Sequence, residues 1–406
     1  MHVLLIHQAF VSVDEPGGTR HHEFALRLAE MGHRVTVLAG QVSYLTGKAS
    51  GSEGEGLANA VPGEVTVRRC YTYPGWHRSF FHRVISFLSL VLSSFVVGIR
   101  VGPVDLVWGT SPPIFQGLSA WGLARLKRAA FLFEVRDLWP SFAVAVGVLK
   151  NRTLIRLAEW LERWLYRRAD GMVVNSPGFV EHVRSRGARC VELVPNGVDA
   201  TMFDPSASGA RFRRDHSLEG RYLVVYAGAH GISNDLDVLL DAAQRLRDRE
   251  DISLALVGDG KEKPSLQARA QRDGLIHVHF LPPVAKREMA DVLAAADACV
   301  AILKPLDAYK TTYPNKVFDY MAAGRPVILA IDGVIRDVVE SAQAGLFVPP
   351  GDPEAMAGAI QWLVEHREEG RAMGRAGRKH VEENFHRALL AAQLERVMIE
   401  LVEARK

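Results

Sequence analysis

The sequence predicts an α/β protein made of two Rossmann-like, doubly wound domains. Two long stretches alternate short apolar runs with amphipathic helical patterns, which is typical of parallel sheets covered by helices. The first stretch opens directly on an apolar strand at residues 1–6, and the second restarts the alternation at Tyr222. A chain of 406 residues is also long enough to bury two separate cores.

The expected boundary between the two domains lies near Phe203. Residues 203–220 combine Pro205, several serines and a cluster of arginines, a composition that indicates a linker. We therefore assign residues 1–203 to an N-terminal domain and residues 204–385 to a C-terminal domain. An amphipathic pattern at 389–404 predicts one last helix after them.

The composition excludes several functional classes. Apolar residues make up 48% of the chain and charged residues 23%, as in ordinary soluble globular proteins. A net charge of +3 is too small to indicate nucleic-acid binding. The three cysteines are far apart and form no Cys-x-x-Cys pair, so neither disulfides nor a zinc site is expected. Without a signal-peptide pattern at the first strand, we expect a cytoplasmic protein.

A turn-rich loop with Gly17 and Gly18 follows the first strand and precedes a helical pattern and a second strand at 35–39. In such a βαβ unit, a phosphate often binds where the helix starts. The diglycine could serve that purpose, or it could only permit a tight turn. The Gly-x-Gly-x-x-Gly and P-loop patterns do not occur, so a dinucleotide or ATP site is not expected.

Polar and aromatic residues gather where two further strands of the first half end, around 111 and 134–139. The carboxyl ends of parallel strands border the ligand crevice, so we expect these residues there. Asp137 could orient an acceptor hydroxyl or accept its proton, or it could only form an ion pair with Arg136. The acceptor-side candidates at these strand ends are Ser111, Glu134 and Trp139.

Two segments of the first half favour contact with a membrane surface. Residues 84–99 are apolar but fall short of the ~20 needed to span a bilayer. Their aromatic and basic flank at 76–83 suits a helix that rests among lipid headgroups. Within 152–169, a predicted helix carries arginines on one face, at positions 152, 156, 163 and 167. We expect 76–100 and 152–169 to hold the protein on the inner membrane face, although core helices with solvated charges would show the same patterns.

The stretch 311–327 predicts a loop, a short helix, a turn and a buried strand. Pro314 suits the first turn of that helix, Gly324 suits the position after its end, and Pro326 prevents its extension. The unpaired amides and the positive dipole of such a helix start favour a phosphate at 312–315.

Two side chains of this short helix favour a nucleotide, rather than a phosphate alone, as the ligand. Lys316 would add a positive charge at the phosphate. One turn further, the Asp319 carboxylate can accept hydrogen bonds from the two vicinal hydroxyls of a ribose. An ordinary helix after an N-terminal loop would fit the local pattern as well.

The run Tyr-Pro-Asn-Lys-Val-Phe-Asp-Tyr-Met-Ala-Ala-Gly at 313–324 resembles glycosyltransferase family 4, whose donor site carries Glu-x7-Glu followed by Met-Ala-x-Gly-x-Pro. It is most similar to the branch that builds bacterial surface polysaccharide, which includes N-acetylfucosamine-type amino-sugar transferases. Arg-Asp-Leu-Trp-Pro at 136–140 and Pro-Asn-Gly-Val-Asp at 195–199 resemble the same family. The resemblance covers nearly the whole chain. It implies the GT-B fold, in which two Rossmann-like domains face each other and the last helix, 386–406, packs back on the N-terminal domain.

The resemblance also implies how the donor is bound, with departures in this chain. Thr311 stands in place of the first acid, and Ala229 and Asn234 replace the usual Arg and Lys of the diphosphate site. Positive charge is then expected from other lysines, and His230 could approach the phosphates or only cap its loop. The expected donor-binding residues are Gly17, Gly18, Gly228, His230, Lys304, Lys310, Thr312, Tyr313, Pro314, Asn315, Lys316 and Asp319.

Together these patterns lead to one expected function. A sugar, expected to be an N-acetylamino sugar, moves from a nucleotide diphosphate sugar, expected to be UDP-linked, to a lipid-linked or glycan acceptor of surface polysaccharide synthesis. Family resemblance implies retention of anomeric configuration, with Asp137, Arg136 and Lys316 as catalytic candidates. No cofactor or metal is expected, because Asp235 and Asp237, which formally match Asp-x-Asp, lie at a predicted helix start and favour capping. A nucleotide-sugar epimerase or hydrolase and a non-catalytic partner subunit are the alternatives.

Overall fold

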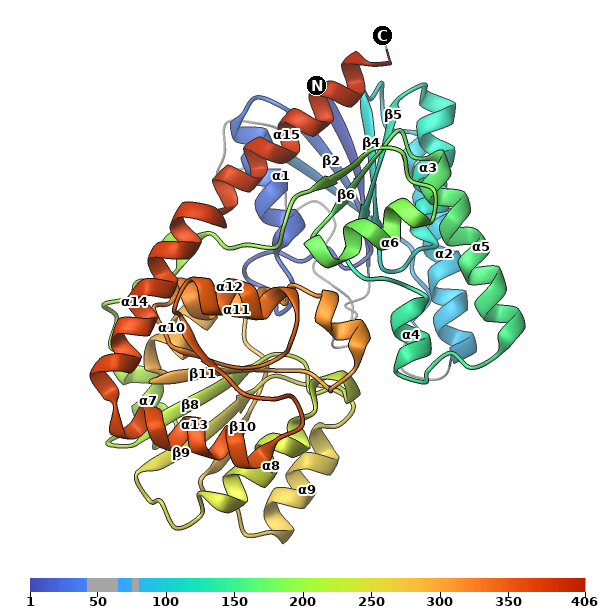
Figure 1. Cartoon of the computed structure of the whole chain (residues 1–406). Coiled ribbons are helices and arrows are strands. Elements are labelled where there is room, and N and C mark those ends of the chain that lie inside the picture. The colour runs from blue at the N-terminus through green and yellow to red at the C-terminus, as the bar shows by residue number, and fades with distance from the viewer. Residues whose placement is uncertain (42–64, 75–79, 406) are drawn as a thin grey trace. The chain divides into compact units, whose positions relative to one another are not determined.

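The computed structural model describes residues 1–41, 65–74 and 80–405. The chain divides into two compact units, which are both visible in Figure 1. Unit 1 comprises Met1–Ser12, Gly18–Pro195 and Ala388–Lys406. Unit 2 comprises Val13–Gly17 and Asn196–Arg387. Each unit is built around one parallel sheet.

Among the described residues, unit 1 contains a seven-stranded sheet with the order β3-β2-β1-β4-β5-β6-β7, and its strand pairs are parallel. The central strands are buried along their whole length, because helices cover both faces of the sheet. The strands are β1 (His2–Ile6), β2 (Arg34–Gly40), β3 (Val65–Cys70), β4 (Leu106–Ser111), β5 (Ala130–Val135), β6 (Gly171–Val174) and β7 (Val191–Leu193).

Helices cover the two faces of this sheet in two separate cores. One core contains side chains of α1 and α15, and the other contains side chains of α2, α3, α5 and α6. The helices of unit 1 are α1 (Arg20–Glu30), α2 (Phe80–Ile99), α3 (Gln116–Lys127), α4 (Ser141–Ala145), α5 (Arg152–Arg168) and α6 (Val180–Ser185), with the 3-10 turn η2 (Pro177–Phe179).

The last helix, α15 (Arg387–Glu403), packs on unit 1. Leu390, Leu394 and Met398 are buried in the core that also contains α1 side chains. Figure 1 shows this helix, in red, beside α1. Its amphipathic spacing thus places it in the core of the first unit.

The sheet of unit 2 has six strands within the described residues, in the order β10-β9-β8-β11-β12-β13. All of its strand pairs are parallel. The strands are β8 (Tyr222–Ala227), β9 (Ile252–Val257), β10 (Val278–Leu281), β11 (Ala298–Ile302), β12 (Val327–Ala330) and β13 (Gly345–Phe347).

Helices also cover both faces of the second sheet. One core includes α10, α11 and α12, and the other includes α8, α9 and α13. The helices are α7 (Ala210–Asp215), α8 (Leu236–Arg245), α9 (Lys263–Arg272), α10 (Lys286–Ala295), α11 (Asn315–Ala322), α12 (Val334–Ser341), α13 (Pro353–Glu365) and α14 (Arg367–Asn384), with 3-10 turns η3 (Ala200–Met202), η4 (Ile232–Asn234) and η5 (Asp307–Thr311).

The expectation of two doubly wound α/β domains is confirmed by these two sheets. In unit 1 the strand order reverses between β1 and β4, and in unit 2 it reverses between β8 and β11. Ligands of open parallel sheets bind beyond the carboxyl ends of the strands at such reversal points. The residues that follow β1, β4, β5, β8, β9 and β11 are therefore the ones to inspect for a site.

Candidate functional site

The start of α11 in unit 2 has the form expected for phosphate binding. Pro314 is the N-cap residue, one position earlier than the first-turn place predicted for it, and Asn315 begins the helix. No side chain caps this helix start. The hydroxyl of Thr312 donates to Tyr309 O at 2.8 Å, and Tyr313 O accepts from Asn196 Nδ2 at 2.6 Å. The loop is thus fixed by its own contacts, and the first amides of the helix are left for a ligand.

The side chain of Lys316 ends in a buried amine at the start of α11. Its Nζ atom is buried and has no hydrogen-bond partner among the described residues. The atom lies 4.0 Å from the centre of the Tyr226 ring. Burial lowers the pKa of Lys316 to about 7. An ammonium group in this position gains most from an anion, because an anion would restore the interactions lost with water.

Gly228, which directly follows β8, is the backbone that Lys316 faces. Its φ of 152° lies in the region that favours glycine. A Cβ atom at this position would come within 2.7 Å of Lys316 Nζ. The predicted donor residues Gly228 and Lys316 are therefore brought together, and the glycine keeps the space at the amine open.

His230 lies buried beside the same strand ends. Its backbone N–H donates to Asp259 O at 2.8 Å, and its carbonyl accepts from Glu262 N at 2.9 Å. Neither ring nitrogen has a hydrogen-bond partner within the described part of the chain. Burial, helped by the Lys263 charge, lowers the pKa of His230 to about 4, so the ring is neutral. The expectation that the ring caps its loop is wrong, because backbone hydrogen bonds close that loop.

Asp319 forms an ion pair with a residue that the sequence did not point to. Lys286 Nζ lies 2.5 Å from Asp319 Oδ2, and the two side chains are only 12% and 15% exposed. Lys286 Nζ also lies 5.4 Å from the centre of the Phe203 ring. Asp319 is therefore a largely buried and paired carboxylate, three residues after Lys316 on the same helix.

The other predicted lysines have partners of their own. Lys310 is about half exposed and pairs with Asp307 at 2.9 Å. Lys304 is half-buried, and its charge opposes the raised pKa that burial gives Asp235. The proposed diphosphate charge therefore centres on Lys316.

The Asp-x-Asp match lies at the start of α8, as predicted. Asp235 is the N-cap residue of this helix, but its side chain makes no capping hydrogen bond within the described residues. Asp237 is engaged by Arg269 at 2.7 Å. Among the described residues, no group of three or more His, Cys, Asp or Glu side chains is arranged to hold a metal ion.

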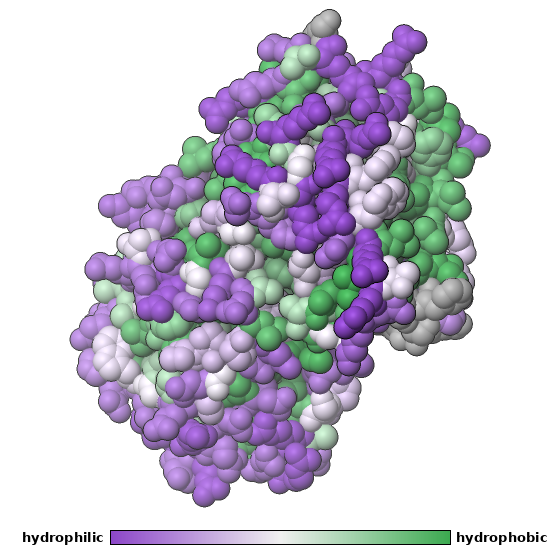
Figure 2. Space-filling model, turned by 45° about the vertical axis from the view of Figure 1, so that its right-hand side comes forward, coloured by the Kyte–Doolittle hydropathy of each residue, from purple (hydrophilic) through white to green (hydrophobic). Residues whose placement is uncertain are grey.

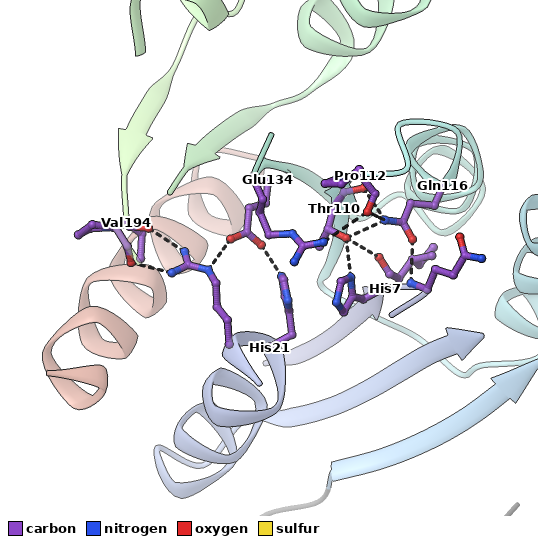
Figure 3. Close-up of polar contacts among 12 residues, drawn as sticks. His7, His21, Thr110, Pro112, Gln116, Glu134 and Val194 are labelled. Atoms are coloured by element: carbon purple, nitrogen blue, oxygen red, sulfur yellow. Dashed lines mark hydrogen bonds and ion pairs between the residues drawn. The ribbon is translucent and has the colours of Figure 1, made fainter. Parts of the chain in front are cut away.

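In unit 1, a buried network joins the ends of β4 and β5 to the start of α1 (Figure 3). Glu134, which is completely buried, accepts from Arg20 Nε at 2.9 Å and bonds His21 Nε2 at 2.6 Å. Arg20 also donates to the carbonyl oxygens of Val194 and Pro195. Glu134 was expected at the acceptor, but both of its oxygens are used inside the protein. Its position makes it a support for α1 and β5.

Charges in this network follow from burial and from Arg20. Burial by itself would raise the pKa of Glu134, but the Arg20 guanidinium and the hydrogen bond from His21 hold it well below its usual range, so Glu134 is ionised. Burial lowers the pKa of His21 to about 4 although Glu134 opposes this. We therefore describe His21 as a neutral ring that donates from Nε2 to Glu134. Its Nδ1 atom is buried and has no partner in the described ranges.

A second part of the network ties β1 to β4. His7, which follows β1, bonds Thr110 Oγ1 through Nδ1 at 2.9 Å. Gln116 Nε2 donates to Thr110 O at 2.8 Å, and Gln116 Oε1 accepts from Gln8 N at 2.9 Å. The His7 and His21 rings are 4.0 Å apart at their centres. Figure 3 shows these side chains pointing toward one another at the strand ends.

Asp137 and Arg136 follow β5 at the same edge of the sheet. Burial raises the pKa of Asp137 to about 6, although the Arg136 charge opposes the rise. Arg136 donates from Nη2 to Pro112 O at 3.3 Å, and its buried Nε atom has no partner in the part of the chain described. Both side chains are half-buried, so they reach the surface at the ligand edge of the sheet.

The remaining predicted residues of unit 1 have varied surroundings. Ser111 is buried at the end of β4, and its carbonyl accepts from Arg136 N at 3.0 Å. Trp139 packs on Phe115 with ring centres 5.6 Å apart. Gly17, which belongs to unit 2, has a φ of 146° that favours glycine, whereas a Cβ atom at Gly18 of unit 1 would meet no atom of the described residues within 4 Å. The space at Gly18 is therefore open, and Gly17 is needed for the turn.

Apolar side chains of unit 1 are exposed on α2 and α5. In the described part of the chain, one helix, α2, has the length and the apolar composition needed to cross a membrane. Only 22% of its residues from His82 to Ile99 are buried. Residues 84–99 alone are too short to span a bilayer, but α2 extends from Phe80 to Ile99. Residues 76–79 of its basic flank lie outside the described residues. The exposed side chains, which we call the apolar face, are Leu88, Leu92, Val96, Ile99, Leu154, Leu157 and Trp160.

Arginines accompany the apolar face on α5. Arg152, Arg156 and Arg167 are exposed, and the Arg168 guanidinium lies 5.6 Å from the centre of the Trp164 ring. Figure 2 shows hydrophobic side chains gathered along the side of unit 1 that α2 and α5 form, with hydrophilic side chains beside them. The two segments predicted to face a membrane therefore expose the residue types that such a contact needs.

Sequence reasoning missed Arg20, His21, His7 and Lys286. Arg20 and His21 follow the diglycine loop, and His7 follows the first strand, so their places at strand and helix ends were the available signal. Lys286 gave no such signal, because only the fold brings the start of α10 to α11.

Two family models match the chain. "Glycosyl transferase 4-like domain" matches residues 17–197, and "Glycosyl transferases group 1" matches residues 221–366. A GDP-mannose-dependent alpha-mannosyltransferase of Mycolicibacterium smegmatis is 30% identical, over 74% of this chain and 77% of that protein. WcaI of Escherichia coli K12, named as a glycosyl transferase of colanic acid biosynthesis, is 24% identical over 75% of this chain and 77% of its own length. Other relatives, such as the D-rhamnosyltransferase WbpZ of Pseudomonas aeruginosa, are matched over only 58% of their length.

Solved structures share the fold over the full chain. Sucrose-phosphate synthase from Thermosynechococcus elongatus has a TM-score of 0.79 at 20% identity and is matched over 99% of both chains. Anabaena HepE, in complex with UDP-glucose, has a TM-score of 0.74 at 16% identity, over 98% of this chain and all of that one.

Proposed function

We propose that this chain, which belongs to the glycosyltransferases of the GT-B type, moves a sugar from a UDP-linked donor to a lipid-linked or glycan acceptor in surface polysaccharide synthesis. The observation that carries the proposal is the buried Lys316 amine, which faces Gly228 and has no hydrogen-bond partner in the part of the chain that the structure describes. The Asp319 carboxylate lies three residues after Lys316 on the same helix. A colanic acid relative and a neighbour with bound UDP-glucose support the polysaccharide and the UDP parts. An N-acetylamino sugar is the proposed cargo.

The diphosphate of the donor binds at Lys316 and the start of α11. The ammonium group supplies the charge that Ala229 and Asn234 do not, and the amides at Asn315 add the positive end of the helix. When the bond from the sugar carbon to the diphosphate breaks, negative charge grows on the departing oxygen. A preorganised ammonium and fixed amides stabilise this charge more than they stabilise the ground state.

The nucleoside extends from there along α11. Asp319 is one turn beyond the phosphate end and presents an ionised carboxylate for the two ribose hydroxyls. Gly228 and Gly258 keep the backbone of the β8 and β9 ends close together, since a Cβ atom at Gly258 would come within 1.9 Å of Gly228 O.

The acceptor reacts at the strand ends of unit 1. Its hydroxyl oxygen forms the new bond to the sugar carbon on the face that the diphosphate leaves, and the electron pair of the old bond departs with the diphosphate. Asp137 accepts the hydroxyl proton, for which a pKa of about 6 leaves it ionised at neutral pH. Arg136 beside it orients that carboxylate. Substitution on one face retains the anomeric configuration.

Positive protein groups take the place that a divalent ion has in other transferases. The reaction is therefore proposed to be metal-independent and to need no cofactor beyond the donor. Full transfer activity in EDTA is the expected result, and recovery of activity only with Mg²⁺ or Mn²⁺ would overturn this part.

The protein is proposed to rest on the inner face of the cytoplasmic membrane through its apolar face. Leu92 and Trp160 are 69% and 55% exposed, and exposed apolar side chains beside arginines suit an anionic lipid surface. This contact would bring the reacting edge of unit 1 near a lipid-linked acceptor.

A thermal-shift screen of UDP, GDP, ADP and TDP and their sugars tests the function first. Ligand at 100 times its Kd stabilises the folded state by about 2.7 kcal/mol, so a bound nucleotide raises the melting temperature by several degrees. UDP ligands are expected to give the largest rise. No rise with any of them would contradict the proposal and favour a non-catalytic subunit. Release of free sugar without acceptor at the transfer rate would favour a hydrolase.

A further inference from the structure

Lys286 lies where a positive charge is least favoured. It is the first residue of α10, and a helix start carries the positive end of the helix dipole. The nearby Glu288 carboxylate accepts from Ala285 N at 3.0 Å and so closes the helix start. A lysine at this position therefore needs a separate negative partner.

That partner is Asp319. The 2.5 Å contact between Lys286 Nζ and Asp319 Oδ2 joins the start of α10 to the second turn of α11. The Phe203 ring lies below the ammonium group, 5.4 Å away. Since the two charged side chains are largely buried, their attraction is stronger than that of a surface ion pair.

The ion pair with Lys286 affects two properties of Asp319 that ribose binding needs, the charge of the carboxylate and its direction. An adjacent positive charge favours the ionised form, which accepts hydrogen bonds and donates none. The close ion pair with Nζ also restricts the side-chain rotamer of Asp319, so that the carboxylate keeps one direction before the ligand arrives. Preorganisation of this kind removes part of the entropy lost on binding.

We propose that Lys286 is a positioning residue for the donor nucleotide. It holds Asp319 in the direction that accepts both ribose hydroxyls, and it thereby sets the preference for a ribonucleotide over a 2′-deoxyribonucleotide. This inference rests on the proposed function, because it takes Asp319 as the group that binds the ribose.

The preference follows from the geometry of two acceptors and two donors. A fixed carboxylate can accept from the 2′ and 3′ hydroxyls together, and a 2′-deoxy ligand loses one of these charge-assisted hydrogen bonds. A mobile carboxylate can turn to the remaining hydroxyl and recover part of the loss. Removing Lys286 should therefore weaken the ribonucleotide more than the deoxyribonucleotide.

Isothermal titration of the full chain with UDP and with 2′-deoxy-UDP tests this. The wild type should prefer UDP by at least about tenfold, as expected for one hydrogen bond to a charged group. Lys286→Met should weaken UDP by about tenfold and narrow the preference to about threefold. Lys286→Arg, which keeps the charge and the donors, should retain most of the UDP affinity and most of the preference for UDP over 2′-deoxy-UDP. If the nucleotide screen selects GDP, GDP and 2′-deoxy-GDP replace the uridine pair.

Lys379→Met is the matched control. Lys379 is an exposed lysine on α14 of the same unit, and its loss should change neither affinity. The melting temperature of each ligand-free variant checks the fold. If Lys286→Met does not fold, Lys286→Gln retains a donor without the charge and should still narrow the preference.

Asp319→Asn separates the two ways of failing. If Asp319→Asn binds UDP like the wild type, the ribose site of the proposed function is wrong. If Asp319→Asn loses UDP while Lys286→Met keeps both the affinity and the preference, the proposed function stands and the role given to Lys286 is overturned. An equal loss for UDP and 2′-deoxy-UDP in Lys286→Met would overturn it too, because it would show a general structural effect.

Discussion

Replacing Lys316 by Met should make the ligand-free protein more stable and its nucleotide binding weaker. Met keeps the length and volume of the side chain and removes the charge. The folded pKa of Lys316 is about 7, below the ordinary value of 10.5. The folded state therefore disfavours the protonated form, and this penalty is full below pH 7 and disappears as the pH rises through about 10.4.

The magnitude follows from the two pKa values. The full penalty amounts to about 5 kcal/mol at 1.36 kcal/mol for a tenfold change, and about 3 kcal/mol of it acts at pH 8. The cation–π contact with the Tyr226 ring offsets little of this at pH 8, because the buried amine is mostly neutral there. Lys316→Met should thus raise the free energy of unfolding by about 3 kcal/mol at pH 8 and have little effect near pH 10.5.

Two assays measure the opposite effects of this change. Urea unfolding at pH 6, 8 and 10 gives the stability, and titration calorimetry at pH 8 gives the UDP affinity. The affinity should fall by at least about 30-fold, because the anion loses its buried cation. UDP binding to the wild type should also take up about one proton at pH 8, seen in buffers of different ionisation enthalpy. The control Lys379→Met should change neither the stability nor the UDP affinity. A ligand-free Lys316→Met protein that is less stable at pH 8, or binds UDP normally, would refute the reasoning.

Three further predictions concern the rest of the protein. The rate of sugar transfer should fall about tenfold for each pH unit below about 6, because Asp137 is protonated there. Asp137→Asn should lower the rate at least about 100-fold at pH 7.5. A rate that does not change with pH would exclude Asp137 as the base. Glu134→Gln should lower the free energy of unfolding by about 3–5 kcal/mol, because it removes the negative charge that pairs with the buried Arg20 guanidinium. Urea unfolding at pH 7 measures this loss. The control Glu403→Gln, at an exposed position, should leave the free energy of unfolding unchanged. The double variant Leu92→Glu, Leu157→Glu should no longer sediment with anionic vesicles. Ile276→Glu should sediment like the wild type, because Ile276 is 89% exposed but lies in unit 2. Equal sedimentation of the wild type, the double variant and Ile276→Glu would contradict membrane contact through the apolar face.

The fold could be predicted because periodicity is local. The apolar run that begins at Tyr222 identified the buried parallel strand β8, and the stretch 311–327 identified a short helix followed by a strand. These features depend on neighbours within one turn or one strand. The helix α15 was predicted for the same reason.

The partners of the site residues could not be predicted, because they are distant in the sequence. Glu134 meets Arg20 and His21 across more than 110 positions, and Asp319 meets Lys286 only because α10 and α11 cover the same face of the sheet. Sequence reasoning therefore named Glu134 as an acceptor-side group, whereas its oxygens are both held inside unit 1. The exposure of α2 was equally hidden, since a core helix and a surface helix of this composition look alike.

The measurement that tests the central claim most directly is the titration of the wild-type chain with UDP in EDTA, repeated with excess Mg²⁺. The account assigns the charge of the diphosphate to the Lys316 ammonium and the amides at the start of α11. It predicts the same UDP affinity in both buffers. Binding that appears only when the divalent ion is present would contradict it.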